Sequence, residues 1–176
     1  SPQDIIKEGV ALITEDRKVT GLNLSGTVND NIAMVAIKKL LTNGLYNKSK
    51  AYKASQEYIE KLNIKTPSAN QIVGNLSGGN QQKVVIAKWL LNEPDIIILD
   101  EPTRGIDVGA KRDIYLLLGK LVQQGKAVIM ISSEIPELMG ICDRVLVMCE
   151  GNDSGEVKRE DFSQERIMTL ASAITV

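Results

Sequence analysis

The sequence contains no histidine, so no catalytic or metal-binding site in it can use an imidazole side chain. Histidine is a common general base and the commonest metal ligand, so Ser-His and Cys-His nucleophile pairs are excluded. Cysteine is scarce too, because only Cys142 and Cys149 occur, among apolar neighbours and without metal-ligand spacing. With no secretory signal at the start, we expect two reduced thiols in the core of a cytoplasmic protein.

Neither a strong net charge nor a long apolar run is present. The 21 Lys and Arg residues balance 22 Asp and Glu residues, so no basic field is available to neutralise nucleic-acid phosphates, and we expect no nucleic acid as a partner. The longest apolar stretches, such as 96–99 and 127–131, fall far short of the roughly 20 residues that span a bilayer. Any membrane link is therefore expected to run through a partner protein.

Hydrophobic periodicity predicts an α/β fold with a mostly parallel sheet flanked by helices. Short apolar runs at 10–14, 96–99 and 127–131 predict strands, and we expect the last two to be buried on both faces, as in parallel sheets. Helical patterns cover 80–91 and 108–123. Ser77 and Asp107 are the expected N-caps of these helices, and Gly125 is expected to close the second.

Two regions flank this core. From residue 28 to residue 64 the apolar residues recur at helical spacing, with a break near Asn43-Gly44, which predicts an α-helical subdomain over 28–74. Residues 75–150 form the predicted core, ending in a short helix at 136–140 and a strand at 144–148. Residues 151–176 form a charged tail with one amphipathic segment at 164–172. The 43% apolar content of 176 residues suits one unit.

The first motif that carries chemistry is Leu76-Ser77-Gly78-Gly79-Asn80-Gln81-Gln82. Two glycines at the start of a helix let backbone N–H groups approach an anion, and the helix dipole favours negative charge there. The alternative interpretation is an ordinary N-cap serine followed by a flexible turn. Alone, the motif does not separate a phosphate site from a helix start.

The second motif is a hydrophobic strand that ends in Asp100-Glu101 and continues as Pro102-Thr103. Ligands of open parallel sheets collect at the carboxyl ends of the strands. Asp100 suits Mg²⁺, and Glu101 can orient or deprotonate water. Two adjacent carboxylates here carry a cost in solvation and repulsion, which favours a functional role over a structural one.

Together the two motifs, with Gly105-Ile106-Asp107 close behind, resemble the ATP-binding-cassette ATPases. Residues 75–143 resemble the family's signature, Walker B and D-loop region. The individual residues at 15–18, 80–82 and 102–107 are similar to those in the C-terminal cassette of bacterial galactose, ribose and xylose importers. The resemblance covers essentially the whole chain. It implies a partial P-loop NTPase fold with an inserted α-helical subdomain.

The resemblance also implies ligands, roles and partners. ATP and Mg²⁺ are the implied ligands: Asp100 would help hold Mg²⁺, Glu101 would polarise the attacking water, and Asp107 would contact an opposite cassette. The implied nucleotide-binding residues are Leu76, Ser77, Gly78, Gly79, Asn80, Gln81, Asp107 and Ser133. The partners would be the N-terminal cassette of the same polypeptide, membrane permease subunits and, indirectly, a periplasmic sugar-binding protein. The resemblance places the protein at the cytoplasmic face of the inner membrane.

The sequence departs from this family's pattern in three places. No segment fits G-x-x-x-x-G-K-[ST], so we expect a chain truncated before its phosphate loop, inactive alone, with a gap in its sheet and a tendency to associate. Glu15 stands where the family usually has a Mg²⁺-sensing glutamine, and its carboxylate is a second candidate ligand for Mg²⁺. Ser133 stands where most members have a histidine. We therefore hypothesise that this half's own site hydrolyses ATP weakly, while its signature serves the partner's site.

Two other function classes remain open at this point. A cassette ATPase of DNA repair or translation would favour a basic surface or long coiled insertions, and neither is present. A structural or regulatory cassette fragment would be distinguished by whether the parent gene encodes an upstream phosphate loop. The sugar cannot be read from these residues, because the resemblance places its selection in other subunits.

Overall fold

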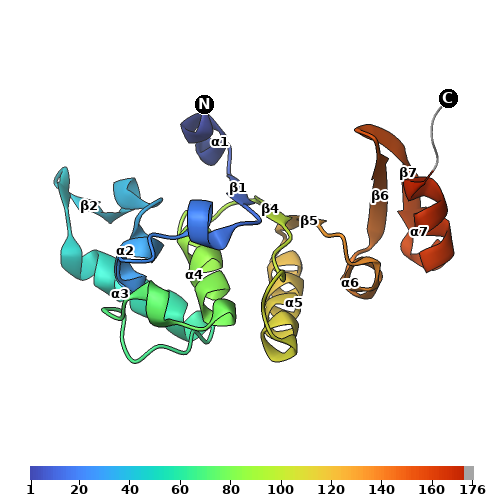
Figure 1. Ribbon diagram of the computed structural model, residues 1–176. Helices are drawn as coiled ribbons and strands as arrows, with labels where there is room; N and C mark the ends of the chain where they lie inside the picture. The colour runs from blue at the N-terminus through green and yellow to red at the C-terminus, as the bar shows by residue number, and fades with distance from the viewer. Residues whose placement is uncertain (173–176) are drawn as a thin grey trace. The chain divides into compact units, whose positions relative to one another are not determined.

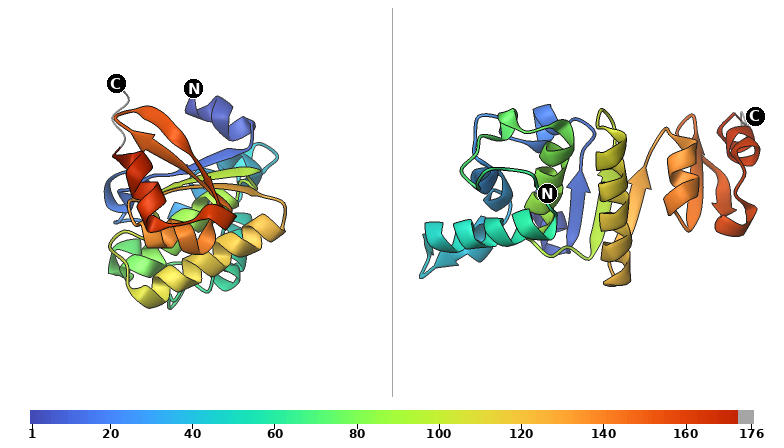
Figure 2. Two further views of the ribbon diagram at one scale, coloured as in Figure 1. Left: turned by 90° about the vertical axis from the view of Figure 1, so that its right-hand side faces the viewer. Right: turned by 90° about the horizontal axis from the view of Figure 1, so that it is seen from below.

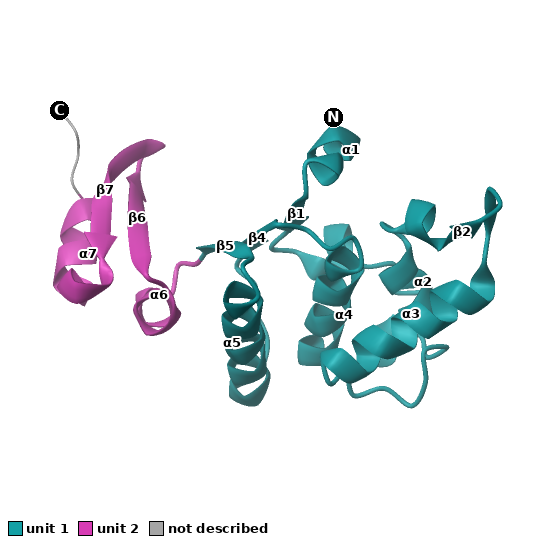
Figure 3. Ribbon diagram, turned by 180° about the vertical axis from the view of Figure 1, so that it is seen from behind, with its two compact units in different colours: residues 1–131 teal, residues 132–176 magenta. Residues whose placement is uncertain are grey.

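The structure is a computed structural model that describes residues 1–172, and it divides into two compact units, 1–131 and 132–176 (Figure 3). The first unit holds most of the predicted core. Its elements are α1 (Pro2–Lys7), β1 (Val10–Ile13), η1 (Arg17–Gly21), α2 (Val28–Ala33), η2 (Ile37–Leu40), β2 (Leu41–Thr42), β3 (Leu45–Tyr46), α3 (Lys48–Lys61), η3 (Val73–Asn75), α4 (Gly78–Leu90), β4 (Ile96–Asp100), α5 (Val108–Gln123) and β5 (Ala127–Ile131).

A three-stranded parallel sheet, in the order β1-β4-β5, organises the first unit. Leu99 of β4 lies opposite Ile13 of β1 on one side and opposite Met130 of β5 on the other. All three predicted strands therefore form, and the central one carries Asp100 at its carboxyl end. The predicted α/β fold with a parallel sheet is confirmed. The predicted gap in the sheet remains a prediction.

The two faces of this sheet differ. Helices α4 and α5 lie on the same face (Figure 1), where Ile97 and Leu99 are buried. On the other face Leu12 is 46% exposed and Ile129 is 51% exposed. The prediction that strands 96–99 and 127–131 are buried on both faces was therefore wrong, because α4 and α5 cover the same side.

The predicted helical subdomain at 28–74 contains helices and also a short hairpin. Thr27 and Asp30 form a capping box at the start of α2, each side chain accepting from the other's backbone N–H. The break at Asn43-Gly44 is the turn between β2 and β3, and both residues have positive φ, as two-residue hairpin turns require. The helices and the break are confirmed, and the boundaries of the subdomain remain a prediction.

Helix α4 is the most enclosed helix of the first unit, with nearly every residue from Gly79 to Leu90 buried. It packs against α2, β1 and α5. Two side chains anchor its flanks: the Tyr58 hydroxyl donates to the Leu90 carbonyl at 2.7 Å, and Lys83 Nζ lies 2.8 Å from the Asp113 carboxylate. The middle and the end of the helix that carries the first motif are thereby held to α5 and α3.

The second unit is a hairpin packed against helices (Figure 2). Its elements are α6 (Ile135–Ile141), β6 (Arg144–Cys149), β7 (Asn152–Lys158), η4 (Arg159–Asp161) and α7 (Gln164–Ala171). Val145, Val147, Val157 and Ile167 form its core. The predicted helix at 136–140, strand at 144–148 and amphipathic segment at 164–172 are confirmed within the described residues, whereas β7 was not predicted.

Both cysteines are half-buried free thiols, and burial raises the pKa of the Cys142 thiol. None of the helices within residues 1–172 has the length and apolar content needed to cross a membrane.

Candidate functional site

The carboxyl end of β4 delivers Asp100 and then Glu101 in an unusual backbone conformation. Glu101 has a φ of 44°, which is rare outside glycine, and its N–H donates to the Ile131 carbonyl at 2.9 Å. Its own carbonyl accepts from the Arg104 N–H at 3.1 Å. Strained residues of this kind cluster at functional sites, where the surrounding structure enforces them. The strand end thus holds a carboxylate pair at a defined turn.

The turn from Glu101 to Asp107 ends where α5 begins. Asp107 has an extended backbone, and its side chain accepts from the Ala110 N–H at 3.0 Å, which is the predicted N-cap bond. Thr103 in the middle of the turn is 1% exposed, whereas Arg104, Gly105 and Asp107 are exposed. Both ends of the turn are therefore anchored while its outer residues face solvent.

Ser77 lies at the N-cap position of α4, as predicted, but its side chain makes no capping hydrogen bond. Instead, its hydroxyl accepts from the Asn80 side-chain amide at 2.9 Å. Asn80 also accepts from the Lys65 N–H at 2.8 Å, and Gln81 donates to the Val73 carbonyl at 3.2 Å. The two amides thus connect α4 to the preceding loop, and their predicted contact with nucleotide remains a prediction, as does that of Leu76.

Glycine at position 79 is required by a contact inside the chain, and Gly78 also has a close neighbour. A Cβ atom added at Gly79 would lie 2.4 Å from the Ala110 Cβ atom, and one added at Gly78 would lie 2.9 Å from the Arg17 guanidinium. From the sequence, these glycines are explained by the approach of an anion alone. The structure adds a second reason, which is the close approach of α5 and Arg17 to the start of α4.

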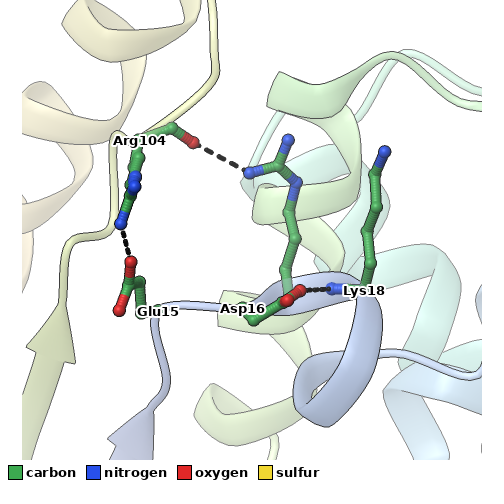
Figure 4. Close-up of a pocket in the computed structure, with 5 residues that line it drawn as sticks. Glu15, Asp16, Lys18 and Arg104 are labelled. Atoms are coloured by element: carbon green, nitrogen blue, oxygen red, sulfur yellow. Dashed lines mark hydrogen bonds and ion pairs between the residues drawn. The ribbon is translucent and has the colours of Figure 1, made fainter.

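An open pocket of about 280 Å³ adjoins the turn and is lined by Glu15, Asp16, Arg17, Lys18 and Arg104 (Figure 4). Glu15 follows the end of β1, and its carboxylate forms an ion pair with the Arg104 guanidinium across the pocket. Asp16 caps the start of η1 by accepting from the N–H groups of Lys18 and Val19. The sequence signal for this loop was its run of four charged residues after a strand.

Arg17 is a residue of this region whose contacts the sequence does not predict. The structure shows it donating to the Arg104 carbonyl at 2.9 Å and to the Gly105 carbonyl at 3.2 Å. A long-range contact of this kind leaves no periodic or motif-like trace in the sequence. It joins residue 17 to a turn almost ninety positions further along the chain.

The carboxylates fit a Mg²⁺ ion that arrives with a nucleotide rather than one held in a protein cage. Within residues 1–172, no three His, Cys, Asp or Glu side chains gather as a metal-binding group. Mg²⁺ in ATPases is usually bound by one or two carboxylates together with phosphate oxygens and water. Asp100, half-buried at the strand end, suits that arrangement. Glu15 is engaged by Arg104.

Most of the predicted site residues lie in the first unit, and two contacts link some of them. The Asp107 carboxylate lies 3.9 Å from where a Cβ at Gly79 would be, so the starts of α4 and α5 are adjacent. The ion pair with Arg104 links Glu15 to the turn that follows Glu101. Ser133 belongs to the second unit, and its place in the site remains a prediction.

The chain is similar in sequence to curated sugar import ATP-binding proteins. The chain is 54% identical to the "Ribose import ATP-binding protein RbsA" of Clostridium tetani over 99% of its length, and 52% identical to the "Xylose import ATP-binding protein XylG" of Thermoanaerobacter pseudethanolicus over 98%. It covers 35% and 34% of those two proteins, so it spans about a third of the curated relatives it matches.

Solved structures share the fold. An ATP-binding cassette solved as a dimer in a post-hydrolysis state, with ADP and Pi, aligns with a TM-score of 0.74 at 26% identity, over 92% of this chain and 68% of that one. A second ATP-binding cassette of an ABC transporter aligns with a TM-score of 0.78 at 20% identity, over 98% and 72%. The family model described as "ABC transporter" matches residues 3–104. On this evidence the chain belongs to the ABC transporter family.

Proposed function

We propose that this chain is part of the C-terminal cassette of an ATPase that energises monosaccharide import in bacteria. One observation carries the proposal: the Asp100-Glu101 turn and the Ser77-Gly78-Gly79 helix start lie in one unit of a chain 54% identical to a ribose import ATP-binding protein. The carboxylates and the helix start support phosphoryl transfer as the reaction, and the names of the relatives support a monosaccharide as the transported solute.

The carboxylates have separate roles in this proposal. Asp100 would hold the Mg²⁺ that accompanies ATP, which neutralises charge on the phosphates. Glu101 would orient and polarise the water that attacks the terminal phosphate. The left-handed backbone at Glu101 turns the chain sharply at the strand end, which fixes where this carboxylate starts.

The start of α4 would contact ATP that is bound chiefly by an opposite cassette. Thirteen residues long, this helix presents free N–H groups and the positive end of its dipole at Ser77, Gly78 and Gly79. Ser77 does not cap them with its side chain. A phosphate group would satisfy these donors, as anions commonly do at helix starts. Asp107, at the adjacent helix start, would face the same opposite cassette.

The proposed partners follow from this arrangement of two cassettes. They are the N-terminal cassette of the same polypeptide, membrane permease subunits contacted by residues 28–74, and a periplasmic sugar-binding protein that acts through the permease. The site of action would be the cytoplasmic face of the inner membrane. The solute class is a monosaccharide, because the relatives are named for ribose and xylose import.

Calorimetry with ATP and Mg²⁺ tests the nucleotide site. We expect no binding by residues 1–176 alone and binding by a polypeptide extended upstream through a phosphate loop. Tight binding by residues 1–176 alone would overturn the proposal, because no segment of the sequence provides a phosphate loop.

Unequal ATP sites in the full transporter are a second part of the proposal. Glu15 and Ser133 replace the usual glutamine and histidine, and a neutral hydroxyl cannot supply the same charge-assisted hydrogen bond as histidine. We therefore expect Glu101→Gln to lower ATP turnover less than the same change at the matching glutamate of the other cassette. Equal losses in a steady-state ATPase assay would refute this asymmetry.

A further inference from the structure

The Arg17 side chain lies where the turn from Glu101 to Asp107 meets the start of α4. Its two terminal nitrogens donate to the carbonyls of Arg104 and Gly105 at 2.9 and 3.2 Å. One of those nitrogens lies 2.9 Å from where a Cβ at Gly78 would be. A single guanidinium therefore touches both elements that the proposed function assigns to phosphate contact and to the opposite cassette.

The local backbone fixes the position of Arg17. The Asp16 side chain accepts from the N–H groups of Lys18 and Val19, which sets the start of η1. At the end of η1, a Cβ added at Gly21 would lie 3.3 Å from Val85 of α4, so η1 packs closely on that helix. The Arg17 side chain leaves this anchored segment already directed toward the turn.

Helix stability does not explain a cation at this place. The N-terminus of a helix carries partial positive charge, so a guanidinium beside Gly78 is disfavoured by the dipole of α4. Arg17 Nε is also enclosed without a hydrogen-bond partner, which adds a desolvation cost. The compensating contacts are the two carbonyls, which the planar fork of arginine binds at once and lysine cannot. These two hydrogen bonds hold the turn and offset the cost of desolvation.

The same turn has a second, weaker link to the loop after β1. The Glu15 carboxylate pairs with the Arg104 side chain, while Arg17 holds the Arg104 and Gly105 backbone. The Glu15 pair is exposed, so its contribution is small. Arg17 thus adds two bonds to the backbone of the turn beside the side-chain pair of Glu15.

We propose that Arg17 is a positioning residue for ATP turnover at the opposite cassette's site, which holds the turn that ends at Asp107 in register with the Ser77-Gly78-Gly79 start of α4. This inference rests on the proposed function. Arg17 acts through the backbone of Arg104 and Gly105. A displacement of about 1 Å in such an arrangement can reduce turnover by on the order of a hundredfold without weakening nucleotide affinity to the same degree.

The test uses the full-length polypeptide with its permease subunits and compares Arg17→Ala, Arg17→Gln and Arg17→Lys. We expect Arg17→Ala to lower kcat by about tenfold or more, with KM for ATP changed less than about threefold. Lysine and glutamine can each bind one carbonyl, so both variants are expected to recover part of the lost kcat. Arg112→Ala, on the exposed surface of α5, is the matched control and should retain wild-type turnover.

Each outcome decides the question. Wild-type kcat in Arg17→Ala would overturn the inference, and so would a loss that only follows a lower thermal unfolding temperature. If Arg17→Ala does not fold, the lysine and glutamine variants carry the test, and full activity in both would overturn it. Failure of the proposed function looks different, because the wild-type protein itself would then show no ATP hydrolysis.

Discussion

Gly79 at the start of α4 lies so close to Ala110 in α5 that a Cβ atom at position 79 would sit 2.4 Å from the Ala110 Cβ atom. Carbon atoms in favourable contact are about 3.5–4.0 Å apart. Glycine at this position therefore lets two helix starts meet, one preceded by Ser77 and the other capped by Asp107. The glycine that the sequence associates with phosphate also determines how the two helices pack.

Substitution of Gly79 by alanine should force α4 and α5 apart. We expect a loss of about 1–3 kcal/mol in the free energy of unfolding, as for other overpacked sites. The second-site change Ala110→Gly should recover most of that loss, because it removes the atom that the new methyl group would meet. Chemical denaturation of the two single variants and the double variant measures this coupling.

Gly119 provides the matched control for this prediction. It also lies in α5, but an added Cβ meets nothing within 4 Å. Gly119→Ala should therefore be neutral or stabilise the protein by up to about 1 kcal/mol, since alanine is the better helix former. A Gly79→Ala variant as stable as Gly119→Ala would contradict the close helix contact.

Removal of the two N-cap side chains should reduce the stability of the protein by different amounts. Asp107→Ala should cost about 0.5–2 kcal/mol of stability, because the side chain accepts from the Ala110 N–H. Ser77→Ala should cost less, because the Ser77 side chain caps no backbone N–H. Thermal and chemical unfolding of both variants checks the order. A larger loss for Ser77→Ala would show that its hydroxyl, not the Asp107 carboxylate, is the stronger cap.

The uncovered face of the sheet predicts a contrast between two isoleucines. Ile97 in β4 is 1% exposed, so Ile97→Ala should cost about 2–5 kcal/mol. Ile129 in β5 points to the other face, and Ile129→Ala should cost less than about 1 kcal/mol. Equal losses, measured by chemical denaturation, would mean that something covers the second face.

The same face should favour self-association of this chain. Leu12 and Ile131 are exposed on the same face as Ile129, and exposed apolar strands of a parallel sheet invite pairing. Ile129→Lys should therefore lower the mass measured by light scattering at high concentration. An unchanged mass would exclude this face as the contact.

Much of the fold could be predicted because its signals are local. The strand at 96–99, the Asp107 cap and the positive φ at Gly125 each follow from short patterns. The strand β7 could not, since Asn152–Lys158 contains few residues that favour strands and forms through pairing with β6 across a bulge. Exposure on one sheet face could not be predicted either, because it depends on where two helices pack.

Some features of the candidate site could also be predicted from the sequence, and others could not. Asp100 and Glu101 stand out because they directly follow an apolar strand. The contacts of Arg17 with the turn could not be predicted, because they join segments far apart in the chain and need no particular neighbours in sequence. The motif at the start of α4 indicated an anion site, but not that the close approach of Ala110 also requires glycine at position 79.

Lys88 in α4 should give the stability of this protein a measurable dependence on pH. Its side chain is buried, donates to the Gly21 carbonyl, and lies 5.8 Å from the centroid of the Trp89 ring. Burial lowers the pKa of the Lys88 ammonium below its ordinary value of 10.5. As pH rises from the folded-state pKa toward 10.5, the unfolded chain binds more protons at this group, so this contribution to stability increases.

Comparison with Lys88→Met isolates that contribution. The free energy of unfolding of the wild type, relative to the variant, should rise with pH over the interval below 10.5. Burial also raises the pKa of Tyr58, which acts in the opposite direction above pH 10, but this effect is present in both proteins and cancels in the difference. Urea denaturation at several pH values provides the measurement. Parallel curves for the two proteins would show that the Lys88 pKa is the same in the folded and unfolded chains.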